Sequence, residues 1–202
     1  PDVETANQSA MEAPSAAVGA ATVEPAAPKE PEDMSTEERS AFASKCKDIG
    51  NRGFKAGDWD YAILAYQEGI RYLEYVPFDK EMKPQAGFDH GGAEQLSQDM
   101  ALAVVLFSNL AATMLKIQEP RQALMYAEKA LRFDGAHVKS VFRRGQALLA
   151  LGEMAEAREA VTALESLGHS PEAATLRSQV EQSVREAQKK DKALFARMLA
   201  KK

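Results

Sequence analysis

The pattern of apolar and polar positions divides the chain into two regions. Residues 1–33 carry five prolines and nine alanines among scattered acids, with little bulky apolar surface. Such a segment cannot offset the conformational entropy that it would lose on ordering. We therefore predict a disordered, acidic linker for residues 1–33, and a functional role for this tail stays open.

Helical signals begin directly after this tail. The sequence Ser-Thr-Glu-Glu at 35–38 is a capping box, which predicts the start of a helix. This helix should run to about residue 56, because Gly57-Asp58 is typical of a turn. A second helix is then predicted for residues 59–74.

A spacing of 34 residues relates three parts of the chain. Units that begin at residues 43, 104 and 138 share one register, and the last two follow each other without a gap. Their eighth positions are Gly50, Ala111 and Gly145, and their twentieth positions are Ala62, Ala123 and Ala157. Small residues at both positions allow two paired helices to approach closely.

This pattern resembles the tetratricopeptide repeat across residues 43–171. The resemblance implies an all-α fold in which residues 34–171 form a right-handed superhelical array with a concave peptide groove. Its three helix-turn-helix repeats would occupy 43–76, 104–137 and 138–171. The chain departs from the family at Gly53, where a large aromatic is usual, and at Arg144, where an aliphatic is usual. Weaker local packing is expected at both.

An insertion and a terminal helix complete the predicted organisation. Residues 77–103 separate the first two units, and their Pro and Gly residues break helix until about Ala93. The next helix should then run to about Ile117. Residues 172–202 are predicted to form a helix after Pro171 that caps the last repeat. Its apolar face would be Leu176, Val180, Val184 and Ala187. A long first loop and such a terminal helix resemble the large immunophilins.

Five polar residues on the predicted first helices carry the candidate chemistry. They are Lys47, Asn51, Asn109, Lys139 and Arg143. Lys139 and Arg143 are four residues apart, as are Lys47 and Asn51, so each pair shares one helix face. Cations donate charge-assisted hydrogen bonds to carboxylates, and amides donate neutral ones. Ordinary solvated helix charges are the alternative interpretation.

The same residue types at these five positions form the dicarboxylate clamp of co-chaperone tetratricopeptide domains. The resemblance implies binding of the C-terminal Glu-Glu-Val-Asp of heat-shock protein 90, or of heat-shock protein 70, which shares that end. Phe54 and Ala112 are expected to pack against the valine, and Lys116 to reach an upstream glutamate. A micromolar ligand, at about −7 to −8 kcal/mol, is expected.

Composition argues against several other functions. A net charge of −5 disfavours a nucleic-acid partner. The single cysteine excludes an intrachain disulfide and suits a reducing compartment, so a cytoplasmic location is expected. No apolar run approaches the length of a membrane span, and no secretory signal opens the chain. Because it begins with Pro1, the chain is expected to be part of a longer protein.

No catalytic, metal or cofactor site is predicted. The histidines His90, His137 and His169 lack partners at ligand spacing. Cys46 is expected to be a buried thiol, and Trp59 and Tyr66 to be packing residues. No phosphate-binding loop or nucleophile elbow is present. The chain is therefore predicted not to be an enzyme, and any peptidyl-prolyl isomerase domain of a parent protein would lie outside it.

The end of the last helix is basic and amphipathic. Its members are Lys189, Lys190, Lys192, Arg197, Lys201 and Lys202, with Leu194, Phe195, Met198 and Leu199. This pattern is found in calmodulin targets. It also suits a structural adaptor that holds another protein on this helix. A solvated helix end is the interpretation that we favour.

Overall fold

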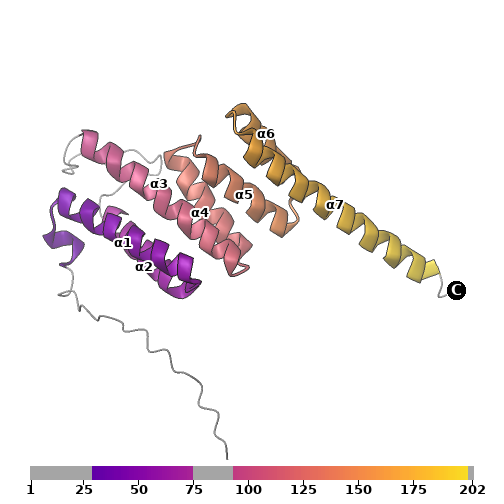
Figure 1. Cartoon of the computed structure of the whole chain (residues 1–202), viewed down its shortest axis with the longest axis horizontal. Coiled ribbons are helices and arrows are strands. Elements are labelled where there is room, and N and C mark those ends of the chain that lie inside the picture. The colour runs from indigo at the N-terminus through magenta and orange to yellow at the C-terminus, as the bar shows by residue number, and fades with distance from the viewer. Residues whose placement is uncertain (1–28, 75–92, 200–202) are drawn as a thin grey trace, which may run out of the picture.

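The computed structural model describes residues 29–74 and 93–199, which form seven α-helices, one short 3-10 helix and no strand. The elements are η1 (Pro31–Asp33), α1 (Thr36–Ala56), α2 (Trp59–Glu74), α3 (Ala93–Lys116), α4 (Pro120–Phe133), α5 (Val138–Leu151), α6 (Met154–Ser166) and α7 (Ser170–Leu199). Helices pack as consecutive antiparallel pairs, and each pair stacks on the next (Figure 1). The predicted all-α fold is confirmed.

The predicted capping box fixes the start of α1. The side chain of Ser35 accepts a hydrogen bond from the backbone N–H of Glu38 at 3.2 Å. The carboxylate of Glu38 accepts one from the backbone N–H of Ser35 at 2.9 Å. Two N–H groups that the helix itself leaves unpaired are thereby satisfied.

A left-handed residue follows the first helix of each pair. The angle φ is 78° at Gly57, 62° at Gln118 and 86° at Gly152. These residues occupy the fifteenth position of the three 34-residue units, where the repeat pattern predicts a turn. The backbone of this turn is therefore left-handed in all three units. Glycine adopts this conformation without a steric penalty, whereas the Cβ of Gln118 makes it costly.

Glycine at the eighth position of the first and third units allows the helices to pack closely, because it has no side chain. A Cβ on Gly50 would lie 2.4 Å from the ring of Tyr66, and one on Gly145 would lie 2.4 Å from Leu176. The fully buried Tyr66 ring therefore rests directly on the backbone of α1. Gly145 in the same way allows α7 to approach α5.

The two departures from the repeat pattern have local explanations in the structure. A Cβ on Gly53 would already lie 3.0 Å from the ring of Tyr61 and 3.2 Å from the carbonyl oxygen of Asp58. A larger residue therefore has no room there. Arg144 directs its guanidinium to Glu128 of α4, with Nε and Oε1 3.8 Å apart.

The terminal helix α7 covers the last repeat with its first half only. Leu176 and Val180 are buried, as predicted, and Val184 is half-buried. Ala187, which we predicted on the same apolar face, is exposed. From Arg185 onward every described side chain is exposed, because α7 extends past the array (Figure 1).

The last residues of the predicted linker differ from the prediction. Residues 29–33 lie on the repeat array, and Pro31 is buried. The hydroxyl of Tyr72 donates to the carbonyl oxygen of Lys29 at 2.9 Å, and Arg71 pairs with Glu30 at 3.1 Å. The aromatic and basic side chains of α2 thus order these residues. The remainder of the predicted linker and most of the predicted insertion, together with residues 200–202, lie outside the described residues.

We expected no apolar run to approach the length of a membrane span, and for one helix this was wrong. The stretch Glu94–Lys116 is long and apolar enough to cross a membrane by length and composition alone. Half of its most apolar window is buried within the array, however. Its apolar residues, including Leu106, Phe107 and Leu110, form the centre of the main core. Burial between neighbouring helices therefore explains this composition.

The left-handed turn makes a stability prediction. Gln118→Gly should raise the free energy of unfolding by about 0.5–1 kcal/mol, because glycine removes the left-handed penalty but adds unfolded-state entropy. The reciprocal variant Gly152→Gln should lower it by about 1 kcal/mol, since a Cβ there meets no atom within 4 Å and only the backbone term changes. Urea denaturation would measure both, and a destabilised Gln118→Gly would contradict this explanation.

Candidate functional site

The first helices of the three pairs carry all five predicted clamp residues. Lys47 and Asn51 lie on α1, Asn109 lies on α3, and Lys139 and Arg143 lie on α5. A hydrogen bond joins Asn51 to Asn109, and Lys139 and Arg143 line one cavity.

A side-chain network links α1, α2 and α3 at Asn51. Its Oδ1 accepts one hydrogen bond from the hydroxyl of Tyr66 at 2.9 Å and another from Nδ2 of Asn109 at 3.1 Å. Two donors on the oxygen fix the orientation of the amide. Within the described residues, the Nδ2 group of Asn51 makes no hydrogen bond, so it remains available as a donor to a ligand.

Tyr66 has a larger role than the packing role that we predicted. Its ring is buried against the backbone of Gly50, which brings its hydroxyl to Asn51, one residue further along α1. Burial raises the pKa of Tyr66, so the hydroxyl keeps its proton and remains a donor. Its sequence position gave no signal for this bond, because the contact depends on how α2 lies on α1.

Arg143 is a partly buried cation on α5. Its guanidinium donates a hydrogen bond to the hydroxyl of Ser108 on α3. Burial lowers the pKa of Arg143 to about 10, and Tyr66 offsets only part of this effect. No carboxylate of the described residues forms an ion pair with it. Ser108 provides a hydrogen bond but no charge, so the site holds a positive charge that a ligand can neutralise.

The two predicted clamp lysines are more exposed. Lys139 lies one turn before Arg143 on α5 and is exposed. Lys47 is partly buried, and its Nζ lies 3.8 Å from Oδ1 of the neighbouring Asp48. This contact is long and its carboxylate is largely exposed, so it neutralises the lysine only weakly.

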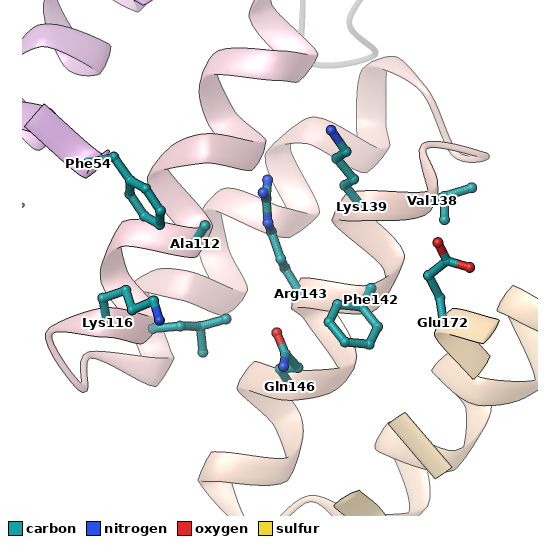
Figure 2. Close-up of a pocket in the computed structure, with 10 residues that line it drawn as sticks. Phe54, Ala112, Lys116, Val138, Lys139, Phe142, Arg143, Gln146 and Glu172 are labelled. Carbon is teal, nitrogen blue, oxygen red and sulfur yellow. The ribbon is translucent and has the colours of Figure 1, made fainter. Parts of the chain in front are cut away.

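A cavity of about 530 Å³ opens beside Arg143, between α1, α3, α5 and α7. Its lining residues are Phe54, Ala112, Leu115, Lys116, Val138, Lys139, Phe142, Arg143, Gln146 and Glu172. Figure 2 shows Phe54 and Lys116 on one side of Arg143 and Glu172 on the other. Two clamp residues and all three predicted secondary contacts therefore line one space, whereas Lys47, Asn51 and Asn109 do not line it.

Some lining residues were missed from the sequence. Gln146 comes three residues after Arg143 and seven after Lys139, so helical spacing alone places it on their face. Phe142 precedes Arg143 on α5 and lines the same cavity (Figure 2). Glu172 comes from α7, and no spacing within α5 indicates it.

The other candidate residues have structural roles. Cys46 is buried, and burial raises its pKa to about 11, so the predicted buried thiol is confirmed. Trp59 packs edge-on against Phe54 with ring centroids 5.2 Å apart, which holds that wall of the cavity. His137 precedes α5 and lies 2.8 Å from the hydroxyl of Ser140 through Nδ1. Within the described residues no group of metal-ligand residues gathers, and His90 lies outside them.

Comparison with known proteins identifies relatives among isomerases. No protein-family model matches the chain. The peptidyl-prolyl cis-trans isomerase FKBP4 of Bos taurus is 32% identical over 171 residues, which cover 84% of this chain and 35% of that protein. The chain thus spans about a third of the length of the curated relatives that it matches.

Several solved structures share the fold. The C-terminal tetratricopeptide domain of an FK506-binding protein from Plasmodium falciparum has a TM-score of 0.66 and 24% identity, over 81% of this chain and 99% of that chain. The first such domain of Spaghetti (RPAP3), bound to the HSP90 peptide SRMEEVD, has a TM-score of 0.54 and 22% identity, over 72% and 95%. The second domain of human RPAP3, in complex with the HSP70 peptide SGPTIEEVD, has a TM-score of 0.52 and 26% identity, over 73% and 98%.

The helix pairs, their common turn and these matches define the class: the chain has the fold of a tetratricopeptide-repeat domain. Within that class it is similar to the FKBP4-type immunophilins. The resemblance inferred from the sequence is therefore confirmed.

The Asn51 network makes a second stability prediction. Tyr66→Phe should lower the free energy of unfolding by about 0.5–1.5 kcal/mol, because Asn51 then loses one of its two donors in a part-buried position. Chemical denaturation would measure this. Tyr61→Phe is the matched control, because Tyr61 is half-exposed and should change stability by less than about 0.5 kcal/mol. Equal effects of the two variants would contradict a structural role for the Tyr66 hydroxyl.

Proposed function

We propose that this chain is a co-chaperone module that binds the C-terminal Glu-Glu-Val-Asp peptide of heat-shock protein 90. The peptide-binding clamp consists of Lys47, Asn51, Asn109, Lys139 and Arg143. The observation that carries the proposal is the partly buried charge of Arg143 at the wall of an open cavity, with which no carboxylate of the described residues forms an ion pair. A terminal carboxylate supplies the missing negative charge.

The chemistry of a chain end fits this site. A terminal aspartate presents two carboxylates, and together they match several donors at once. Lys139 and Arg143 supply charge on α5, while Asn51 and Asn109 donate without adding charge. Lys47 lies one turn before Asn51 and adds a third cation. The proposed ligand therefore needs its own free C-terminus.

The cavity beside the clamp offers places for the residues that precede the terminal aspartate. Phe54 and Ala112 form an apolar wall for the valine. Lys116 is an exposed cation on α3 that matches an upstream glutamate. Because an extended chain alternates its side chains, apolar and acidic residues can contact different walls of one cavity.

The proposed role is binding and not catalysis. The curated relatives are named as peptidyl-prolyl isomerases, but this chain matches only about a third of their length. We propose that any isomerase domain of the parent protein lies outside this chain and that the module acts in the cytoplasm without a cofactor. The repeat units would be 43–76, 104–137 and 138–171, followed by the capping helix.

Arg143 offers a test in which binding and stability separate. Arg143→Met should weaken binding of Met-Glu-Glu-Val-Asp by about tenfold or more, because one charge-assisted contact is lost. The unbound domain should become as stable or more stable, since a buried charge without a partner is removed. Calorimetric titration and urea denaturation would measure the two effects.

The neighbouring Arg144→Met is the matched control for this test. Arg144 pairs with Glu128 away from the cavity, so its loss should leave peptide affinity unchanged. Lys139→Ala should also weaken binding. If Arg143→Met binds the peptide as tightly as the unmodified chain, the proposed clamp is wrong.

A structural adaptor is the second candidate function, because the end of α7 presents apolar side chains that no other described residue covers. Phe195, Met198 and Leu199 are about 60% exposed on a helix that extends past the array. A protein that binds the chain equally well with and without competing Met-Glu-Glu-Val-Asp would support this function. Calmodulin, which favours basic amphipathic helices, is one partner to test.

A further inference from the structure

The guanidinium of Arg143 makes one hydrogen bond within the described residues, and its acceptor is a serine outside the proposed clamp. Nη1 of Arg143 donates to Oγ of Ser108 on α3. Ser108 is 1% exposed, and it is not among the residues that line the cavity. Because this hydroxyl is buried away from the cavity, any effect that it has on a bound peptide must be transmitted through Arg143.

We infer that Ser108 is a positioning residue that holds the guanidinium of Arg143 in the orientation that a terminal carboxylate needs. The inference rests on the proposed function, because it assigns a role within the same site. Ser108 would increase the affinity for the peptide without touching it.

The core of the array fixes the position of the acceptor. Phe107 and Leu110, on either side of Ser108 in α3, are 1% and 0% exposed and belong to the main core. The backbone at Ser108 is therefore held by close packing. Only the χ1 bond of a serine separates its backbone from its oxygen, so few positions of Oγ remain available.

The donor, in contrast, is a long side chain with many rotamers. Ordering an arginine side chain costs conformational entropy, which otherwise opposes the binding of a ligand. A hydrogen bond from Arg143 to a fixed acceptor orders the guanidinium before the ligand arrives. The clamp arginine is then preorganised, and less of the binding free energy is lost to ordering it.

The bond to Ser108 leaves the rest of the guanidinium available to a ligand. Its donor is Nη1, while Nε and Nη2 make no hydrogen bond within the described residues. These two nitrogens form an edge of the guanidinium that can donate to both oxygens of one carboxylate. The hydroxyl is also neutral, so it orients Arg143 without cancelling the positive charge that attracts the ligand.

A purely structural link between α3 and α5 is the alternative role for this bond. Its loss would then lower the free energy of unfolding and leave the peptide affinity of the folded domain unchanged. Ser140 provides a matched control, because it is also fully buried and its hydroxyl lies 2.8 Å from Nδ1 of His137. Its bond involves none of the clamp residues.

Calorimetric titration with Met-Glu-Glu-Val-Asp tests the inference. Ser108→Ala should weaken binding by about threefold to tenfold, because the peptide must then order Arg143 itself. Ser108→Thr retains the hydroxyl and should bind within about twofold of the unmodified chain, as should Ser140→Ala. In an Arg143→Met background, Ser108→Ala should cause no further loss, since the side chain that it positions is absent.

Circular dichroism would confirm that each variant is folded. If Ser108→Ala does not fold, Ser108→Cys replaces it with the same expected loss, because a thiol is similar in size but accepts only weakly. Unchanged affinity in the folded variant overturns the inference and leaves the clamp standing. An equal loss in Ser108→Thr, or an undiminished loss in the Arg143→Met background, overturns it as well. If the unmodified chain does not bind the peptide, the proposed function fails, and the inference fails with it.

Discussion

Asn51 joins the first two helix pairs through a single side-chain oxygen, and the arrangement of the proposed clamp depends on this contact. The oxygen accepts from Tyr66 and from Asn109, so three helices are held at one point. One helix pair further along, Arg143 donates to Ser108, the residue before Asn109, which ties α5 to α3. Polar bonds between neighbouring first helices therefore set the spacing of the donors.

The geometry of these bonds follows from very small side chains. Gly50 allows the Tyr66 ring to lie on α1, and Gly145 allows α7 to approach α5. The second contact brings Glu172 to the edge of the cavity. Close packing and the functional surface thus share one cause. A larger residue at either glycine would separate the helices and move the donors apart.

Much of the fold could be predicted from the sequence, because its signals are local and repeated. The capping box, the turn at Gly57 and the small residues at regular spacing each act within one helix pair. What the sequence could not show were contacts between elements distant in sequence. The bond from Tyr66, the approach of Glu172 and the ordering of residues 29–33 by Tyr72 and Arg71 all depend on how helices lie on one another. The apolar composition of α3 is not specific on its own, because burial within an array and burial in a membrane both favour apolar residues.

The central claim is that the site recognises a free chain end. The most direct measurement is a calorimetric titration of the chain with Met-Glu-Glu-Val-Asp beside the same peptide carrying a C-terminal amide. Amidation removes one carboxylate and leaves every side chain unchanged. The proposed clamp predicts micromolar binding of the free acid and a loss of about tenfold or more on amidation. Equal affinity for the two peptides, or no binding of either, would contradict it.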